Sequence, residues 1–261
     1  MLLGGFVEAL PFLGKVALVT GSSRGIGHTI AATLARDGAD LVATYRRAGK
    51  SFDQGTELCE CIRGLGRRAL LVQGDISVKA DVTRMVDAAV ATMGRLDFLV
   101  LNAAVAPFKP LEKLFERELK QLVGVNFIGN ILCIQAALPH LQESGGGIVF
   151  ISSLGSRFYN PSYPLGSMKA AMEAVVRDCA ESLRDTGVTA NGVCAGLVRT
   201  DSFKVLRRLW EGIDRLPQEL FVEPQEVADV VSFLLSPASR AIRGQTIVVD
   251  HGMSNRLGFV G

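Results

Sequence analysis

The feature that most constrains the fold is a regular alternation, from residue 15 onward, of short β-branched apolar runs with longer amphipathic segments. Such an alternation predicts a parallel sheet, because each strand–helix–strand unit lays its helix on a face of the sheet. Seven strands are expected, at 15–20, 40–45, 68–73, 96–101, 146–152, 187–193 and 245–250. Helices are expected near 25–37, 51–64, 79–93, 112–139, 164–185 and 224–235. The sequence therefore predicts an α/β protein with a doubly wound, seven-stranded parallel sheet and helices on both faces.

Length and composition fit one domain of this kind. The chain has 261 residues, 48% of them hydrophobic, which is enough for one large core. We expect a single domain over 1–261, with an N-terminal extension at 1–14 and a substrate-binding lid at 196–223, the one long interval without a strand pattern. The apolar extension lacks a basic leading segment and is too short to span a bilayer. We therefore expect a cytoplasmic protein with no membrane partner.

Charge and metal-binding residue types exclude several functions. The 28 basic and 26 acidic residues are spread along the chain and give a net charge of +2, so no footprint for nucleic acid is expected. Five cysteines and three histidines share no ligand spacing, so neither a disulfide framework nor a metal site is expected. Small molecules or protein surfaces are the expected partners.

A glycine-rich turn, TGSSRGIG, follows the first predicted strand. Its glycines allow the chain to turn tightly, approach a pyrophosphate and pack the next helix against the sheet. The N-terminus of that helix offers free N–H groups to a phosphate. We predict a Rossmann dinucleotide site whose phosphate-binding residues are Gly21, Ser23, Arg24, Gly25, Ile26 and Gly27.

The residues at the ends of later strands predict which dinucleotide binds. A carboxylate after the second strand would bond a ribose 2′-hydroxyl, but this chain has Arg46 and Arg47 there. Together with Arg24 these residues favour NADPH, unless they simply face solvent. Asp75 is a candidate partner of the adenine amino group and Asn102 of a neighbouring strand, and either role could be purely structural. The other residues predicted at these two strand ends are Ile76 and Ala103.

With this turn, the strand–helix order and LNAA at 101–104, the chain resembles the short-chain dehydrogenase/reductase family over essentially its whole length. Four segments look like the enoyl-acyl carrier protein reductases of the family, most closely the NADPH-dependent FabL type. They are ISSLGSRFYNPSY (151–163), KAAMEA (169–174), CAGLVRT (194–200) and RGQTIVVDHG (243–252). The resemblance implies hydride transfer from NADPH to the C=C bond of an enoyl thioester, in fatty acid biosynthesis or a specialised branch of lipid metabolism.

The spacing before Lys169 departs from both patterns known in this family. Ketoreductases place a tyrosine four residues before the lysine, where both side chains share one helix face, but Leu165 occupies that position here. Enoyl reductases place the tyrosine seven residues before the lysine, whereas Tyr163 is six before it. On a continuous helix that step turns the tyrosine about 120° away from the lysine. Pro164 resolves the conflict, because proline suits a first helical turn and pushes the preceding residue toward an extended conformation.

The resemblance also implies roles for individual residues. Tyr163 is the expected donor to the thioester carbonyl oxygen, and Lys169 is expected to bond the nicotinamide ribose hydroxyls. Tyr159 is the reserve donor, and Ser153 matches a second active-site hydroxyl of several relatives. The segment that lines the nicotinamide half of the cofactor is matched by Val198 and Thr200.

Two further expectations come from the resemblance. Asn126 corresponds to a helix asparagine that supports a proton relay in ketoreductases, with a purely structural hydrogen-bonding role as the alternative. The apolar helices predicted at 112–139 and 164–185 pair across subunits in this family. A homotetramer or homodimer is therefore implied.

The segment 196–223 predicts substrate contacts. Its apolar side chains either line an acyl channel under a mobile lid or form the packed faces of two short helices; they are Leu197, Val198, Phe203, Leu206, Leu209, Trp210 and Leu216. Its basic side chains favour the phosphates of an acyl carrier protein or coenzyme A thioester, without choosing between the carriers; they are Arg199, Lys204, Arg207 and Arg208.

Three functions are compatible with these observations. The favoured one is an NADPH-dependent reductase of enoyl thioesters. The first alternative is a carbonyl or alcohol oxidoreductase of the same family. The second is a catalytically inactive NADP-binding relative, since the spacing of Tyr163 and Lys169 matches neither pattern.

Overall fold

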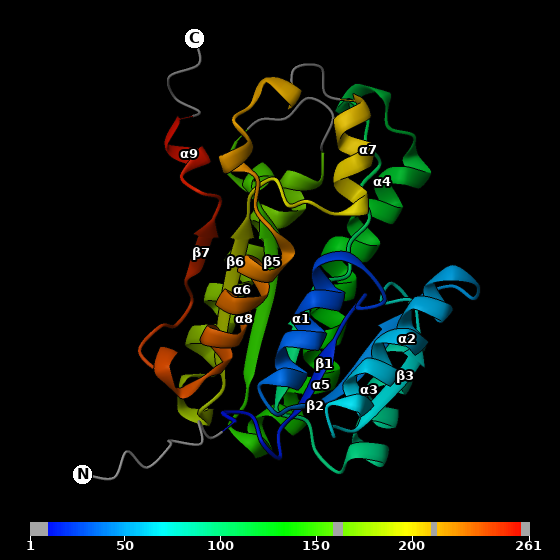
Figure 1. Ribbon diagram of the computed structural model, residues 1–261, viewed down its shortest axis with the longest axis vertical. Coiled ribbons are helices and arrows are strands. Elements are labelled where there is room, and N and C mark those ends of the chain that lie inside the picture. Colours follow the sequence, from blue (N-terminus) through cyan, green and yellow to red (C-terminus); the bar gives the residue numbers. More distant parts are fainter. Residues whose placement is uncertain (1–9, 159–163, 210–212, 257–261) are drawn as a thin grey trace.

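The computed structural model describes residues 10–158, 164–209 and 213–256. At its centre is one seven-stranded parallel sheet with the strand order β3-β2-β1-β4-β5-β6-β7 (Figure 1). This confirms the predicted sheet, and all seven strands lie close to the predicted bounds. They are β1 (Val16–Val19), β2 (Asp40–Tyr45), β3 (Ala69–Gln73), β4 (Phe98–Leu101), β5 (Gly147–Ser153), β6 (Thr189–Ala195) and β7 (Thr246–Val249).

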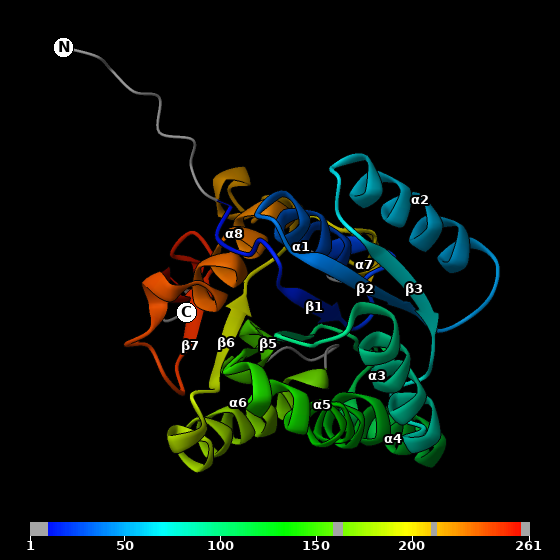
Figure 2. The same ribbon diagram turned by 90° about the horizontal axis from the view of Figure 1, so that it is seen from below.

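Helices cover both faces of the sheet (Figure 2). One face carries α1 (Gly25–Arg36), α2 (Lys50–Gly64) and α8 (Pro224–Leu235). The other carries α3 (Lys79–Met93), α5 (Asn130–Ser144) and α6 (Leu165–Ser182). Each layer buries its own apolar cluster against the strands. The remaining short 3₁₀ turns outside the segment 196–223 are η1 (Leu111–Lys113), η3 (Leu154–Ser156), η4 (Arg184–Thr186) and η7 (Pro237–Ser239).

The strand order reverses direction between β1 and β4. From β1 the chain proceeds outward through β2 and β3, and it then returns to place β4 on the other side of β1. Loops on either side of such a switch point diverge and leave a crevice at the carboxyl ends of the strands. The fold therefore determines where a ligand site is expected.

In place of the helix predicted at 112–139, the structure has an interrupted helical run, Glu116–Ser144. It runs through α4 (Glu116–Val123), a π-helical stretch η2 (Gly124–Gly129) and α5. Two asparagine side chains explain the interruption, because each bonds a backbone carbonyl four residues earlier: Asn126 that of Leu122 at 2.9 Å, and Asn130 that of Asn126 at 2.8 Å. Such π-helical turns are frequent at functional sites.

Among the described residues, one helix is long and apolar enough to cross a membrane by length and composition alone, the continuous run Glu116–Ser144. A core helix passes the same test, and 44% of the most apolar stretch of this helix is buried inside the fold. Its α5 part packs against α3 and β4. The apolar side chains of this helix therefore belong in good part to the core of the sheet protein.

The interval 196–223 contains a helix that the strand pattern did not predict. It holds α7 (Asp201–Leu209), η5 (Ile213–Arg215) and η6 (Gln218–Leu220), and a parallel bridge between Val198 and Val222 joins its ends. Figure 1 shows α7 at the end of the molecule toward which the strands point. The short α9 (Met253–Arg256) follows β7 near the same end. Closure of this segment as a lid stays a prediction.

Candidate functional site

A crevice of about 970 Å³ lies at the carboxyl ends of the strands. The sequence-predicted residues that line it share no single stretch of chain but meet there from several strand ends and loops and from helix α6. They are Gly21, Ser23, Arg24, Gly25, Ile26, Arg46, Arg47, Asp75, Ile76, Asn102, Ala103, Ser153, Lys169, Val198 and Thr200. The fold thus brings together the predicted cofactor residues, while their individual roles stay predictions.

Gly27 does not line the crevice, but its lack of a side chain leaves room for Asn102 and for the backbone of Gly21. A Cβ on this residue would overlap the side-chain amide of Asn102 and the carbonyl oxygen of Gly21. Gly21 and Gly25 themselves have φ values of +64° and +59°, in the left-handed region that favours glycine. The side chain of Arg24, the residue before α1, forms no hydrogen bond that caps the helix. The first N–H groups of α1 therefore remain available as donors. This cradle fits a dinucleotide pyrophosphate.

A hydrogen-bond network joins the glycine turn to the neighbouring strands. Thr20 Oγ1 accepts from the backbone N–H groups of Asn102 and Ala103 at 2.9 and 3.0 Å. The Asn102 amide donates to the carbonyls of Thr20 and Gly21 at 2.9 and 3.1 Å. On the other side, the Gly21 N–H donates to Thr44 Oγ1 at 2.9 Å. Asn102 therefore ties β4 to β1, one of the two roles that its position in the sequence suggested.

Basic side chains gather at the β2 end of the crevice. This part is lined by Arg24, Arg46, Arg47 and Lys50. No carboxylate directly follows the end of β2 in the sequence. Asp75, from the end of β3, lies 3.9 Å from the Arg46 guanidinium. One Asp75 oxygen is occupied by the backbone and hydroxyl of Ser77, whose N–H and O–H donate to it at 3.0 and 2.6 Å. The pocket thus has a strongly cationic corner.

Lys169 lies at the floor of the crevice, on the first turns of α6. Its residue is only 5% exposed, its Nζ donates to the carbonyl of Ile151 at 2.6 Å, and the Nζ lies 4.7 Å from the centre of the Phe150 ring. Burial lowers the pKa of Lys169 to about 8, and the neighbouring Cys194 and Glu173 oppose that shift. The side chain therefore changes between the ammonium and the neutral amine at a pH of about 8.

The wall beside Lys169 is apolar where ketoreductases have their phenol. Leu165 is buried, lines the crevice and precedes the lysine by one helical turn. Pro164 is the N-cap of α6, so the helix begins at Leu165, one residue later than the predicted start at 164. Tyr163 and Tyr159, the predicted donor and its reserve, lie outside the described residues. Ser153 lines the crevice at the end of β5, where its Oγ accepts from the Gly155 N–H at 3.3 Å.

Asn126 uses its side chain to hold a loop. Its Oδ1 accepts from the Val105 N–H at 3.0 Å, and its Nδ2 donates to the carbonyls of Val105 and Leu122 at 2.8 and 2.9 Å. Its own backbone carbonyl accepts from the Asn130 amide. These bonds give Asn126 a structural role, the alternative that its position in the sequence left open; a proton relay through it stays a prediction.

The apolar side chains of 196–223 divide between the two roles proposed for them. Leu197, Val198, Phe203 and Leu206 line the crevice, whereas Leu216 packs into a small cluster with other buried side chains. Trp210 and the side chain of Leu209 lie outside the described part of the chain. The crevice wall also contains apolar residues from other elements: Phe108, Leu154, Phe158, Leu165 and Met253.

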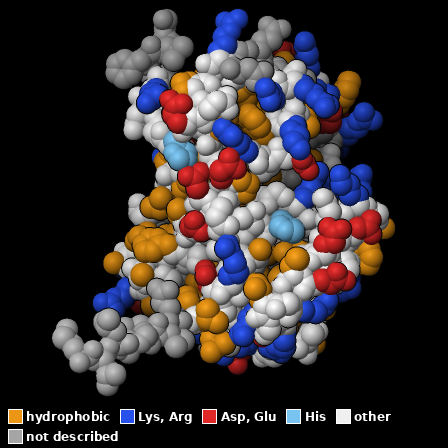
Figure 3. Space-filling model, viewed as in Figure 1, with side chains coloured by type: hydrophobic (Ala, Val, Ile, Leu, Met, Phe, Trp, Pro, Cys, Tyr) orange, Lys and Arg blue, Asp and Glu red, His pale blue; other side chains and the backbone are white. Residues whose placement is uncertain are grey.

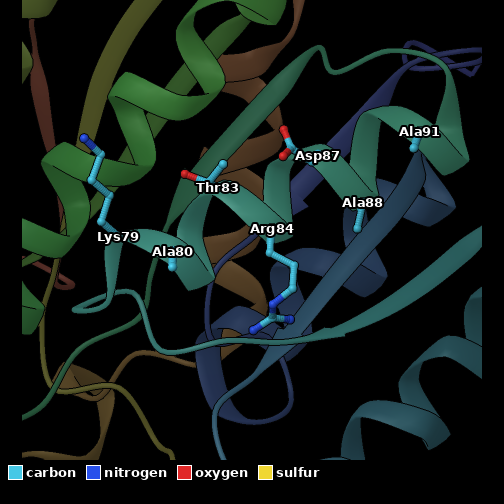
Figure 4. A pocket seen from close by; sticks show the side chains of 7 residues that line it. All are labelled: Lys79, Ala80, Thr83, Arg84, Asp87, Ala88 and Ala91. Carbon is cyan, nitrogen blue, oxygen red and sulfur yellow. The ribbon is translucent and has the colours of Figure 1, made fainter.

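A second hollow, of about 840 Å³, follows the outer surface of α3 (Figure 4). Its lining is Lys79, Ala80, Thr83, Arg84, Asp87, Ala88 and Ala91. Arg84 is engaged with Asp81 and with the carbonyl of Gln73, at 2.7 and 2.8 Å. The hollow contains none of the predicted site residues that the structure describes, and it lies on one helix away from the strand ends. The crevice at the switch point is therefore the candidate site.

Phe108 and Glu173 are among the contributors to this region that sequence reasoning missed. Phe108 reaches the crevice from the loop after β4, and no pattern in that loop distinguishes it. Glu173 is buried on α6, one turn beyond Lys169. A signal for Glu173 was present, because it is an isolated acidic residue in the otherwise apolar stretch AAMEAVV.

Several known proteins are similar to this chain over most of its length. A family model described as enoyl-(acyl carrier protein) reductase matches residues 21–254. The 1-cyclohexenylcarbonyl-CoA reductase of Streptomyces collinus is 37% identical over 248 residues, which cover 92% of this chain and 87% of that protein. The 3-oxoacyl-[acyl-carrier-protein] reductase FabG of Staphylococcus epidermidis is 31% identical over 245 residues, covering 92% and 99%.

The solved structures agree with the sequence comparison. A short-chain dehydrogenase from Burkholderia cenocepacia in complex with NADP superimposes with a TM-score of 0.83 and is 33% identical, covering 92% of this chain and 98% of that one. The chain belongs to the short-chain dehydrogenase/reductase family and is an oxidoreductase.

Proposed function

We propose that the protein is an NADPH-dependent reductase of enoyl thioesters. The observation that carries the proposal is the apolar, buried Leu165 one helical turn before Lys169. A ketoreductase of this family needs a phenol there, whereas an enoyl reductase takes its hydroxyl from an earlier residue. The family match and the enoyl-CoA reductase from Streptomyces collinus support the same choice.

The proposed cofactor follows from the charge at the end of β2. Arg46 and Arg47, with Arg24 from the glycine turn, would hold the 2′-phosphate, since planar guanidinium groups form paired hydrogen bonds with phosphate oxygens. Gly21 and Gly25 would admit the pyrophosphate to the N-terminus of α1. When bound, NADPH supplies a hydride to the β-carbon of the conjugated thioester.

The chain's own groups would handle the charge that develops on the thioester oxygen. Tyr163, proposed from its place in the sequence alone, would donate a hydrogen bond to that oxygen, and Ser153 stands at the crevice as a second hydroxyl. Lys169, cationic below a pH of about 8, would bond the ribose hydroxyls and favour negative charge nearby. The apolar wall formed by Leu165, Phe203 and their neighbours would exclude water around the acyl chain.

The surface around the crevice suits an anionic carrier. On the face shown in Figure 3, Lys and Arg side chains gather over the upper part, toward which the strands point. Two basic residues of the segment 196–223 are partly neutralised: Arg199 lies 3.4 Å from Glu223, and Lys204 lies 2.8 Å from Asp201. Arg208 is exposed on the same helix, α7. Both coenzyme A and acyl carrier protein thioesters fit such a surface.

Carbonyl reduction is the second candidate. It is favoured by the 31% identity to a 3-oxoacyl reductase and by Ser153, a hydroxyl at the strand end where a carbonyl oxygen could be bound. Under this alternative Tyr163 would serve a ketone oxygen. Enoyl reduction and carbonyl reduction would use the same cofactor, but the first predicts a preference for enoyl thioesters and the second a preference for ketoacyl thioesters.

The test is a substrate panel read by the loss of NADPH absorbance. Crotonyl and acetoacetyl thioesters, each on coenzyme A and on acyl carrier protein, are compared with NADPH and with NADH. We expect crotonyl reduction with NADPH to be fastest. Tyr163→Phe should lower kcat by about 10²- to 10³-fold, the usual effect of removing one hydrogen-bond donor to a developing oxyanion, without weakening NADPH binding.

Tyr159→Phe is the matched control, since it removes a phenol four residues away on the same segment. A faster reaction with the acetoacetyl substrates would favour the carbonyl alternative. Unchanged turnover in Tyr163→Phe, or its loss in Tyr159→Phe instead, would reject the proposed donor. Tight NADPH binding without turnover of any substrate would favour an inactive relative.

A further inference from the structure

A buried carboxylate lies directly behind the crevice and has no part in the function proposed above. Glu173 is 8% exposed and lies on α6 four residues after Lys169, on the same side of the helix. A carboxylate in such a place needs several hydrogen bonds to offset the loss of water. Its partners therefore indicate what the residue holds in place.

Those partners all belong to one short segment. Glu173 Oε1 accepts hydrogen bonds from the hydroxyls of Ser152, at a very short separation, and of Ser156, at 2.6 Å. Glu173 Oε2 lies 3.7 Å from the Arg157 guanidinium. One carboxylate thus binds three side chains within the six residues 152–157.

The segment is also held by backbone packing. Gly166 presses its backbone against η3, so that a Cβ there would overlap the carbonyl of Gly155. Arg157 donates to the carbonyl of Thr246 in β7 at 3.3 Å. The glycine contact sets how near the segment lies to α6, but it supplies no directional bond. The bonds to Glu173 are those that determine the orientation of Ser152 and Ser156.

This segment leads into the chemistry. Ser153, which lines the crevice, lies between Ser152 and Ser156, and Ile151, whose carbonyl accepts from Lys169, directly precedes them. In sequence, Tyr159 comes two residues after Arg157. Any rotation of the segment would move the Ser153 hydroxyl and the start of the stretch that bears the predicted phenols.

Charged and titratable groups face this site from each neighbouring element. Lys169 and the backbone-bonded Arg177 come from α6 itself, Arg157 comes from the segment after β5, and Cys194 comes from β6. Asp250, after β7, also acts on Cys194. Burial, and after it the Glu173 charge, raise the pKa of Cys194 to about 11. Cys194 therefore stays a neutral thiol beside Glu173.

We propose that Glu173 is a positioning residue: through its bonds to Ser152 and Ser156 it fixes the segment 152–157, and thereby the hydroxyl groups that act on the substrate. This inference rests on the proposed function for the identity of the substrate, but not for the geometry. It implies that the acceptor oxygen of Glu173 matters more than its charge.

Two substitutions separate these properties. Glu173→Gln keeps an acceptor oxygen for both serines and removes the charge, whereas Glu173→Leu keeps the size and removes both. We expect Glu173→Leu to lower kcat by about 10- to 100-fold, as for other losses of orientation at an active site, while KM for the thioester and the Kd for NADPH stay within about threefold. Glu173→Gln should retain most of the wild-type kcat.

A second readout does not depend on turnover. Amide hydrogen exchange of peptides covering 152–158, measured without ligand, should be faster in Glu173→Leu and close to wild type in Glu173→Gln. Asp178→Asn is the matched control, because it removes an exposed carboxylate from the same helix. It should change neither readout. If Glu173→Leu does not fold, Ser156→Ala removes one of the two bonds and should show a smaller change in the same direction.

The outcomes distinguish this inference from the proposed function. Rates are compared on whichever thioester the wild type reduces fastest, so a preference for ketoacyl substrates overturns the enoyl assignment and leaves the ratios between variants intact. A folded Glu173→Leu with wild-type kcat and wild-type exchange would overturn the positioning role. So would a Glu173→Gln as slow as Glu173→Leu, or a loss of NADPH affinity in step with kcat.

Discussion

The two sides of the crevice are built differently. On the nucleotide side, Gly21 and Gly25 adopt left-handed φ values, and the hydroxyls of Thr20 and Thr44, at the ends of their own strands, accept bonds from neighbouring loops. On the substrate side, the segment after β5 depends on a carboxylate from the next helix, Glu173 on α6. The nucleotide side therefore combines glycine turns with residues at strand ends, whereas the substrate side depends on one buried helix carboxylate.

This difference explains what a single sequence reveals. Glycines and strand ends leave a local pattern, so the nucleotide side could be predicted residue by residue. Contacts such as that between Ser156 and Glu173 join positions 17 residues apart and leave no local pattern. The two sides of the crevice therefore depend on different kinds of residue, and substitutions on each side should have different effects.

The largest effect is expected from Lys169→Met on the substrate side. Loss of the buried ammonium should lower kcat/KM by about 10²- to 10³-fold, the usual effect of removing one preorganised electrostatic group. Steady-state kinetics with the best thioester provide the measurement. Lys79→Met, an exposed lysine on α3, is the control and should behave as wild type. A Lys169→Met enzyme within threefold of wild type would show that the substrate side does not depend on this cation.

A smaller effect is expected on the nucleotide side from Arg46→Ala combined with Arg47→Ala. Hydrogen bonds to charged groups contribute about 1.5–3 kcal/mol, so the preference for NADPH over NADH should fall by about 10- to 100-fold. The ratio of kcat/KM values for the two cofactors measures this. Arg67→Ala, a change at the opposite end of β3, should leave the ratio unchanged. An unchanged ratio in the double variant would mean that these arginines only face solvent.

Particular elements show how much of the fold the sequence could predict. All seven strands followed from their β-branched runs, and α3 and α8 were predicted with their observed ends. The π-helical stretch η2 was not predicted, because it results from two asparagine side chains that bond the helix backbone. Helix α7 lies in the interval 196–223, for which the sequence left open either a lid over an acyl channel or the packed faces of two short helices; the structure has an α-helix there, DSFKVLRRL.

The candidate site, like the fold, could be predicted from the sequence only in part. The cofactor residues were predicted from motif and strand ends, and the structure brings them to one crevice. Glu173 and Phe108 were missed, because their roles depend on partners that only folding brings near them. The apolar wall at Leu165 was evident from the sequence as a missing tyrosine, before any contact was known.

The pH dependence of the free enzyme gives a further, smaller test of the substrate side. Burial holds the pKa of Lys169 near 8, below its ordinary value of 10.5, so the cation is lost as the pH rises through about 8. If the cationic form is the active one, kcat/KM should be level below that pH and fall about tenfold per pH unit above it. The activity that remains in Lys169→Met should not show this fall in kcat/KM above a pH of about 8. A wild-type profile level to pH 10 would contradict the assignment.

The smallest effect on activity is expected from Asp97, a buried carboxylate at the opposite ends of the strands that carry the nucleotide side. Asp97, just before β4, accepts from Arg95 Nε and Nη2 at 2.7 and 2.6 Å, from Lys15 Nζ at 3.0 Å and from the Val16 N–H at 3.0 Å. Burial opposes its ionisation, but these bonds outweigh burial and hold the pKa of Asp97 below its ordinary value. It lies at the amino ends of the strands, away from the crevice.

Asp97→Asn should therefore reduce the free energy of unfolding by about 2–4 kcal/mol at pH 7 and leave NADPH affinity unchanged, because it breaks a buried ion pair whose cations are partly exposed. A carboxylate with a lowered folded pKa stabilises the protein above its unfolded pKa of about 3.9, and that stabilisation is lost as the pH falls through the folded value. Urea unfolding at pH 7 and pH 4, beside Asp178→Asn, measures both effects. Equal stability of wild type and Asp97→Asn at pH 7 would contradict the assignment. A loss of NADPH affinity would mean that anchoring at the amino ends reaches the crevice, and that the nucleotide side too depends on distant side chains.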